Sequence, residues 1–291
     1  MQPCLRTVPV FGIGSYTFPW AVGVAGQGLP SSIGPDELLQ LADSLGAVRL
    51  QLADNLPVHT LPEHRWQSVL TEAASRNIQI ELGMRGLTED RLLRYLSLAT
   101  DCNSPFLRVV IDGPGYTPGH DEIIGTLRAV LPGFTRAGVC LAIENHDRFR
   151  AQELVDIIAA TDSTMVGICL DTANSLGANE SIYEVTRLLA PHTVNLHVKD
   201  YCIRRFDHQM GFTVEGRAAG DGQCPIAWLL AELAPYGKCQ SAILETWSLP
   251  LDTIVASIAR EQAWAERGAT FLRGCLHDLY QLHQPSLTDE V

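Results

Sequence analysis

The sequence has few basic residues, and that shortage argues against one class of protein. It contains 21 Lys and Arg against 33 Asp and Glu, which gives a formal net charge of −12, and it has no block of like charge. Proteins that bind nucleic acid usually carry a clustered basic stripe. We therefore expect no nucleic-acid partner.

Paired cysteine spacing is also missing. The eight cysteines form no CxxC motif, and several lie inside apolar runs such as "GVCLAIE" and "VGICLD". Scattered cysteines in apolar runs are typical of reduced core residues in a cytosolic protein. We therefore expect a cytoplasmic protein with free thiols and without a structural zinc site.

Long hydrophobic runs are confined to the N-terminal region. The stretch "VPVFGIGSYTFPWAVGVAGQG" follows Arg6 and resembles the apolar part of a signal peptide, but Pro9 and Pro19 interrupt it and it alternates like a strand. We expect a strand there. No other segment approaches the ~20 apolar residues that a membrane span needs, so no membrane partner is expected.

The sequence does contain a regular succession of short apolar runs rich in β-branched residues. Each run is followed by a longer stretch of helical periodicity, such as "PDELLQLADSLG" or "TEDRLLRYLSLAT". Helix end signals flank several of these stretches, with Pro35 or Pro62 near a start and Gly46 or Gly138 after an end. The expected strands cover residues 10–18, 47–53, 78–84, 106–112, 139–146, 166–172, 193–200 and 241–247.

Eight strand–helix units predict an α/β fold, a (β/α)8 TIM barrel that forms a single domain over residues 1–280, with a polar tail at 281–291. A doubly wound open sheet is the main competitor. Its phosphate-binding fingerprint, GxGxxG after the first strand, is absent, because "GIGSYTF" has only the first two glycines. One long irregular connection is expected over residues 201–225, and connections of that length are usually functional.

Four consecutive expected strands end in residues that can bind a metal ion. These are Glu144 in "LAIENHD", Asp171 in "ICLDTAN", His197 in "VNLHVKD" and Glu245 in "AILETW". One such residue is more often a helix cap or a loop contact, but four in succession would surround one rim of a barrel. Three carboxylates there raise one another's pKa unless a cation keeps them ionised. Three oxygen donors and one imidazole favour Mn²⁺ or Mg²⁺ over Zn²⁺, so we expect one divalent metal.

This arrangement resembles the xylose-isomerase-like TIM barrels of the sugar phosphate isomerase and epimerase superfamily, over essentially the whole chain. In that family the two glutamates bind the metal and, in epimerases, also transfer protons, which implies both roles for Glu144 and Glu245. Many members have a histidine three residues after the strand-six aspartate, where it meets a substrate hydroxyl. This chain has Asn174 there. The DNA-repair branch needs further histidine ligands and a basic groove, and neither is found in this sequence.

The segments "LAIENHDRF", "GICLDTANSLG", "LHVKDYCIRR" and "MGFTVEGRAAGDGQ" are most similar to the branch that includes 3-oxo-isoapionate decarboxylase. The resemblance implies a lyase that removes CO₂ from a 3-oxo sugar acid, such as 3-oxo-isoapionate, through a metal-stabilised enediolate. Two alternatives stay open: a sugar or sugar-phosphate isomerase or epimerase with Glu144 and Glu245 as its proton-transfer pair, and a subunit of a 3-oxo-C-glycoside-cleaving enzyme. The expected partner is a small sugar acid or keto sugar, and a homo-oligomer is one possible assembly.

Four further residues are candidates for contacts with substrate. Lys199 follows His197 by two positions, so strand alternation places both on one face, where the lysine could act in catalysis or pair with a ligand carboxylate. Arg217 in "EGRAAGDG" could fold over a substrate carboxylate or be a solvated loop residue. His146, two residues past the strand-five glutamate, could bind substrate or be an ordinary rim histidine. His208 could belong to a lid or to a surface loop.

Overall fold

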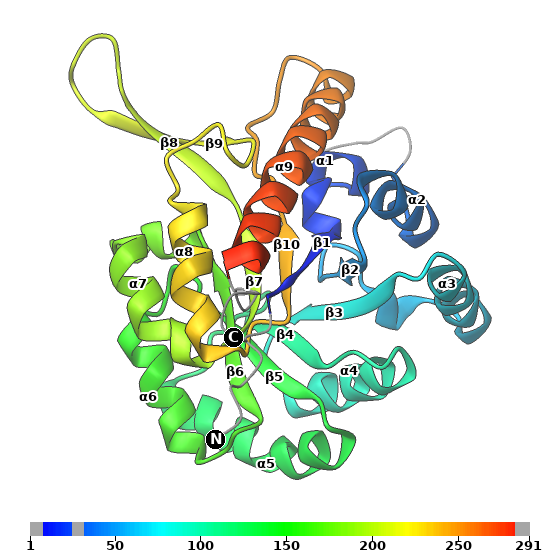
Figure 1. Ribbon diagram of the computed structural model, residues 1–291. Helices are drawn as coiled ribbons and strands as arrows, with labels where there is room; N and C mark the ends of the chain where they lie inside the picture. The colour runs from blue at the N-terminus through cyan, green and yellow to red at the C-terminus, as the bar shows by residue number, and fades with distance from the viewer. Residues whose placement is uncertain (1–7, 25–31, 283–291) are drawn as a thin grey trace, which may run out of the picture.

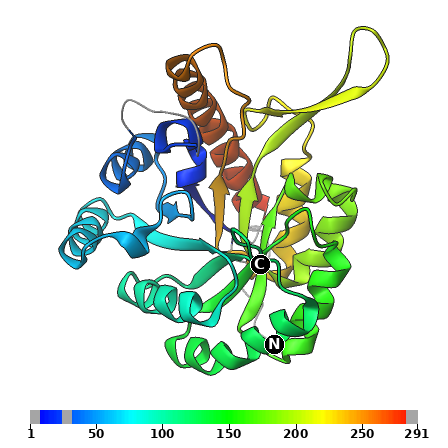
Figure 2. The same ribbon diagram turned by 180° about the vertical axis from the view of Figure 1, so that it is seen from behind.

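Eight parallel strands close into a barrel in the described part of the chain. The computed structural model describes residues 8–24 and 32–282. The order around the barrel is β1-β10-β7-β6-β5-β4-β3-β2, so the last barrel strand pairs with the first (Figures 1 and 2). The barrel strands are β1 (Val10–Gly14), β2 (Arg49–Leu52), β3 (Gln79–Arg85), β4 (Phe106–Val110), β5 (Cys140–Glu144), β6 (Val166–Asp171), β7 (Thr193–Val198) and β10 (Ser241–Leu244).

Helices surround the barrel on the outside, as both ribbon views show. They are α1 (Pro19–Val22), α2 (Pro35–Leu45), α3 (Glu63–Ser75), α4 (Glu89–Asp101), α5 (His120–Ala137), α6 (Ala151–Thr161), α7 (Ile182–Leu189), α8 (Ile226–Leu233) and α9 (Ile254–Leu282). No helix within residues 8–24 and 32–282 is long and apolar enough to cross a membrane. The tail expected over 281–291 lies outside the described residues from position 283 onward.

The boundaries of several helices follow from local sequence. α2 begins at Pro35, whose fixed φ suits a first helical turn, and it ends before Gly46, which has a φ of 71°. α5 ends in the same way before Gly138, at a φ of 69°. Only a residue without a Cβ adopts this left-handed conformation at little cost, so glycine stops both helices where the chain turns back to a strand.

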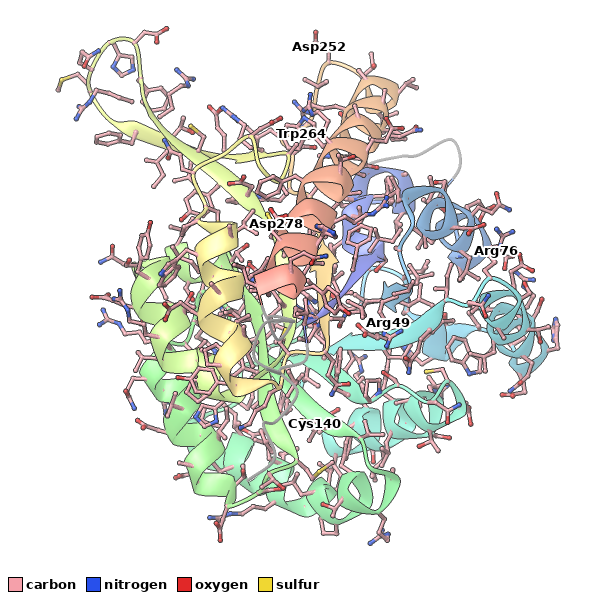
Figure 3. All side chains as sticks on the ribbon, viewed as in Figure 1. Arg49, Arg76, Cys140, Asp252, Trp264 and Asp278 are labelled. Atoms are coloured by element: carbon pink, nitrogen blue, oxygen red, sulfur yellow. The ribbon has the colours of Figure 1, made fainter. Side chains whose placement is uncertain are left out.

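The expectation of an irregular connection over residues 201–225 is corrected by the structure. Here β8 (Asp200–Arg205) and β9 (Phe212–Arg217) pair in an antiparallel hairpin that projects away from the barrel (Figures 1 and 3). The two strands pair only with each other, and the side chains of Ile203, Phe212 and Val214 stay exposed. The usual pattern of a strand with one buried face is therefore missing from this segment, which is why the sequence gives so weak a signal for it.

The barrel interior holds a layer of buried polar side chains. Asn195 on β7 accepts from Nε2 of Gln51 on β2 at 3.1 Å and donates to Oγ of Ser241 at 2.9 Å. Ser241 donates in turn to Glu81 on β3 at 3.0 Å. These strands are not all neighbours, so the contacts cross the barrel axis. The layer is at most 1% exposed and forms the floor of the site described next.

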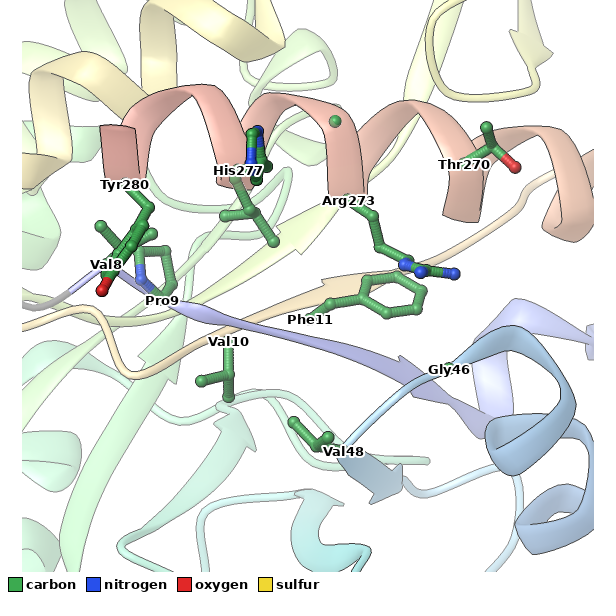
Figure 4. Close-up of a pocket in the computed structure, with 12 residues that line it drawn as sticks. Val8, Pro9, Val10, Phe11, Gly46, Val48, Thr270, Arg273, His277 and Tyr280 are labelled. Atoms are coloured by element: carbon green, nitrogen blue, oxygen red, sulfur yellow. The ribbon is translucent and has the colours of Figure 1, made fainter. Parts of the chain in front are cut away.

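A separate apolar pocket of about 970 Å³ lies beside the first residues of β1. Figure 4 shows Val8 to Phe11 on one side and Arg273, His277 and Tyr280 of α9 on the other. This is where the barrel strands begin. Active sites of TIM barrels form where the strands end, so this pocket is not the candidate site.

Candidate metal centre

Four side chains meet where the barrel strands end. Glu144 and Asp171 are the last residues of β5 and β6, His197 lies in β7, and Glu245 follows β10 directly. Nδ1 of His197 lies 3.1 Å from Oε1 of Glu245, 3.4 Å from Oε2 of Glu144 and 3.9 Å from Oδ2 of Asp171. The four residues are at most 3% exposed. We call this group the candidate metal centre.

The orientation of His197 is set by the polar layer below it. Nε2 of the imidazole lies 2.7 Å from Oε1 of Gln51, whose amide nitrogen already donates to Asn195. The amide oxygen of Gln51 can only accept, so Nε2 of His197 carries the hydrogen. Nδ1 of the neutral ring therefore directs its lone pair at the three carboxylates, and it has no hydrogen-bond partner.

These residues fit a divalent cation. A buried lone pair that faces three carboxylates is unfavourable unless something positive lies between them. Ligand atoms of Asp171, His197 and Glu245 lie within 4.8 Å of one another, which is the scale of a coordination shell. A second group of such atoms joins Glu144 and His197 to Cys169, whose thiol already donates to Oδ1 of Asn195 at 3.0 Å. The donor set is therefore carboxylate oxygen and imidazole nitrogen.

Arg108 on β4 neutralises one side of the centre. Its Nε donates to Oε2 of Glu144 and its Nη1 donates to Asp54 at 2.6 Å. Burial raises the pKa of Glu144, but nearby cations, first Arg108 and also Lys199, outweigh it and lower the pKa to about 2. Burial likewise raises the pKa of Asp54, and Arg108 reverses this, so the net shift is downward. Both carboxylates are therefore held in the ionised form.

Lys199 neutralises the opposite side. Its Nζ lies 2.7 Å from Oδ2 of Asp171 and 3.1 Å from Oε2 of Glu245. Burial alone would lower the pKa of Lys199. The negative charges of Asp171, Glu245 and Glu144 have the larger, opposite effect, so the net shift is upward and the ammonium keeps its proton. Lys199 directly follows β7, and its side chain lies on the side of the candidate metal centre.

Asn174 and the turn that carries it connect Asp171 to Glu144. Oδ1 of Asp171 accepts from the backbone N–H groups of Ala173 and Asn174 at 2.8 and 2.9 Å, which fixes the start of the short helix Asn174–Leu176. Nδ2 of Asn174 then donates to Oε1 of Glu144 at 2.8 Å. The amide that replaces the usual family histidine therefore holds a candidate ligand.

A cavity of about 120 Å³ opens next to the candidate metal centre. Glu144, Glu245, Lys199, Asn174 and His146 line it, which brings together five residues that the sequence pattern selected. The other lining residues are Tyr16, Asp54, Arg85 and Arg108. The hydroxyl of Tyr16 donates to Asp54 at 3.0 Å, and burial, with the Asp54 charge, raises the Tyr16 pKa, so this phenol stays protonated.

Two sequence candidates do not line this cavity. Arg217 ends β9, where its Nη2 donates to Glu215 at 2.8 Å and its Nη1 donates to the carbonyl of Gly216. His208 lies near the tip of the β8–β9 hairpin, exposed and stacked on Phe206. Roles in substrate binding for these two residues stay predictions from sequence.

Sequence reasoning missed several residues that shape the site. Gln51, Arg108 and Arg85 interrupt or end apolar strand patterns, in "AVRLQLA", "FLRVVID" and "IQIELGMR". A polar side chain inside an otherwise apolar strand is the signal that could have selected them, because a central strand of a barrel is buried on both faces.

A model of the xylose isomerase-like TIM barrel family matches residues 84–275. The 3-oxo-isoapionate decarboxylase of Pectobacterium atrosepticum is 31% identical over 262 residues, which cover 90% of this chain and 94% of that protein. This match extends over nearly the whole length of both proteins.

Two solved structures resemble the barrel. A xylose isomerase-like TIM barrel protein from Mycobacterium smegmatis, solved in complex with magnesium, has a TM-score of 0.68 at 14% identity, covering 92% of this chain and 97% of that one. D-psicose 3-epimerase from Clostridium cellulolyticum H10, solved with D-tagatose, has a TM-score of 0.70 at 16% identity, covering 92% and 99%. At these identities the likeness shows the shared fold alone.

Proposed function

The chain belongs to the xylose isomerase-like TIM barrel family, and from that premise we propose that it is a divalent-metal-dependent decarboxylase of a 3-oxo sugar acid, such as 3-oxo-isoapionate. Family and fold support an enzyme of the sugar isomerase, epimerase or decarboxylase type. The narrower reaction is supported by the similarity to the named decarboxylase over most of both chains.

The observation that carries the choice is how Glu144 is held. Epimerisation needs two groups that exchange protons with substrate carbon, and in this family they are the two glutamates. Here Glu144 accepts from Arg108 on one oxygen and from Asn174 on the other, and its pKa is lowered to about 2, chiefly because Arg108 outweighs the effect of burial. A carboxylate with so low a pKa is a poor base. Decarboxylation needs no base, because loss of CO₂ itself supplies the electron pair.

The reaction balances with groups that line the cavity. The bond between the carboxylate carbon and its neighbour breaks, CO₂ leaves, and the electron pair of that bond becomes an enolate conjugated with the 3-oxo group. A divalent metal at the centre would supply Lewis acidity for the developing oxyanion. One proton must then be added to the carbon that lost CO₂. We assign this proton to Nζ of Lys199, which is protonated and lines the cavity.

Two further residues orient the candidate metal ligands. Gln51 keeps Nδ1 of His197 free as a metal donor, and Asn174 fixes Glu144. The ligands Glu144, Asp171, His197 and Glu245 suit Mn²⁺ or Mg²⁺, since three of them offer oxygen. The substrate would be a small sugar acid, in keeping with the cavity of about 120 Å³.

An isomerase or epimerase is the second candidate, because Glu144 and Glu245 line the same cavity. It requires Glu144 to take up a proton in spite of Arg108. Solvent deuterium would then enter the carbon-bound positions of recovered ketose substrate. Under the decarboxylase proposal, recovered substrate gains none.

The direct test is CO₂ release from 3-oxo-isoapionate by the purified protein. We expect release that a chelator abolishes and added Mn²⁺ restores. Glu245→Gln should lower the rate by at least about 100-fold, because it removes a ligand of the centre, whereas the matched change Glu266→Gln on the exposed face of α9 should leave it unchanged. Isomerised or epimerised sugar without CO₂ release would refute the proposal.

A further inference from the structure

Among the described residues, one cation that lines the cavity forms no ion pair. Nε of Arg85, at the end of β3, is buried without a hydrogen-bond partner, and Nη2 contacts only a ring nitrogen of His146, at 3.2 Å. Within the described ranges, no carboxylate oxygen lies within 4.0 Å of this guanidinium. A buried guanidinium edge without an acceptor is costly, so Arg85 is the cavity residue with spare capacity for an anion.

The other two cations of the cavity are already engaged. Arg108 bonds to Glu144 and Asp54, and Lys199 lies between Asp171 and Glu245. Between β5 and α6, the guanidinium of Arg148 donates to both oxygens of Asp112, at 2.6 and 2.8 Å. Arg148 shows the two-oxygen arrangement that a guanidinium adopts with a carboxylate. Arg85 has no such acid beside it, and its Nη2 contacts His146 instead.

His146 positions Arg85 without neutralising it. Arginine can only donate, so Nε2 of His146 accepts from Nη2, and Nδ1 of the ring carries the hydrogen and donates to Asp147. The ring is thereby locked between Asp147 and the guanidinium. The positive charge of Arg85 stays available on the side that lines the cavity.

We infer that Arg85, oriented by His146, is the residue that binds the substrate's carboxylate, in place of the loop residue Arg217. The inference rests on the proposed function and makes it specific, because a sugar acid then enters with its carboxylate on Arg85 and its hydroxyl and keto oxygens toward the metal centre. When the carbon–carbon bond breaks, the carboxylate leaves as neutral CO₂ and the ion pair with Arg85 is lost. Release of this product is thereby favoured.

Binding measurements on the metal-loaded, full-length protein separate this inference from the proposed reaction. The probes are xylonate, xylitol and ribose 5-phosphate. Xylitol has the same number of carbons as xylonate but no charge. We expect Arg85→Gln to weaken xylonate binding by about 10- to 100-fold, the loss of a charged hydrogen-bond pair, and to leave xylitol binding unchanged. Arg148→Gln, the matched control, should change neither. Arg85→Lys keeps the charge but loses the fork, so it should give an intermediate affinity and provides a second variant if the glutamine protein does not fold.

Three outcomes overturn the assignment. In the first, xylonate binds the unmodified protein no more tightly than xylitol does. In the second, the Arg85 variants lose equal affinity for xylonate and xylitol. In the third, the protein prefers ribose 5-phosphate to xylonate, and this preference depends on Arg85. Catalysis is scored independently. If Arg85→Gln releases CO₂ at the rate of the unmodified protein, the inference is contradicted and the proposed function is not. If the protein releases no CO₂ but binds xylonate through Arg85, the proposed function is contradicted and the inference about Arg85 is supported.

Discussion

The ammonium of Lys199 lies 2.7 Å from the carboxylate of Asp171, inside the group of residues that fits a metal ion. The protein thus places its own cation beside the candidate ligands, and Arg108 does the same for Glu144 on the other side. Buried carboxylates need such partners to stay ionised. The centre is therefore balanced by fixed cations that a divalent ion would supplement, and this arrangement has measurable consequences.

Replacing Lys199 should make stability dependent on the metal. In Lys199→Met the carboxylates of Asp171 and Glu245 lose a buried partner, which costs about 3–5 kcal/mol when nothing compensates. We expect a melting temperature several degrees below that of the unmodified protein in the presence of a chelator, and a smaller difference with saturating Mn²⁺. The other lysine of the chain, Lys238, bonds to the carbonyl of Pro191 on the surface and offers the control Lys238→Met. An equal melting temperature for the Lys199 variant in the chelator would contradict this account.

Replacing Gln51 should weaken metal binding without removing a ligand. Gln51 fixes which nitrogen of His197 carries the hydrogen, and loss of such an outer partner typically costs about 10- to 100-fold in metal affinity. We expect this loss in Gln51→Leu, measured by titration with Mn²⁺, while Gln67→Leu on the exposed side of α3 changes nothing. Unaltered Mn²⁺ affinity in Gln51→Leu would show that the tautomer of His197 is set in another way.

Stability should depend on pH through Glu81 in the polar layer. Burial raises the pKa of this carboxyl from 4.5 to about 7. Between these values the folded protein keeps a proton that the unfolded chain has released, so the free energy of unfolding falls as pH rises through this interval and stays lower above it. Glu81→Gln should reduce the fall between pH 4.5 and 7 by up to about 3 kcal/mol.

Urea denaturation at pH 5 and pH 8 measures that difference. A residual pH dependence is expected from Glu261, whose pKa burial also raises to about 7 although it accepts from the backbone N–H groups of Trp20 and Ala21. The same pH dependence in Glu81→Gln and the unmodified protein would rule out the contribution of Glu81.

Much of the barrel can be predicted from sequence because its pattern is redundant. Each of the eight strands is a β-branched apolar run followed by a helical stretch, and all eight are found. The first is shorter than expected, because it ends at Gly14 and Ser15–Thr17 form a 3-10 helix. The β8–β9 hairpin was missed because Ile203 and Val214 pair across it but pack on no core, so their exposure removes the usual pattern. Apolar residues alternate along a strand when one face of it is buried, and these hairpin side chains are exposed.

The candidate site was predictable in part because each of four strands ends in a residue type that can bind a metal ion. Glu144, Asp171, His197 and Glu245 share that position, and the structure brings them together. Arg85 was missed for a physical reason. Its partner His146 is distant in sequence, and which strand residues face the axis follows from barrel closure and not from any single strand. Arg217 was selected because glycines surround it, yet its guanidinium is satisfied by Glu215.

The central claim is that the metal-dependent reaction is loss of CO₂ and not proton exchange. The most direct measurement follows 3-oxo-isoapionate labelled with ¹³C in its carboxylate by NMR, in D₂O with Mn²⁺. The account predicts that the label appears as bicarbonate, that the sugar product carries one deuteron at the carbon that lost the carboxylate, and that recovered substrate carries none. Label that stays in the sugar while substrate hydrogens exchange with solvent would contradict it.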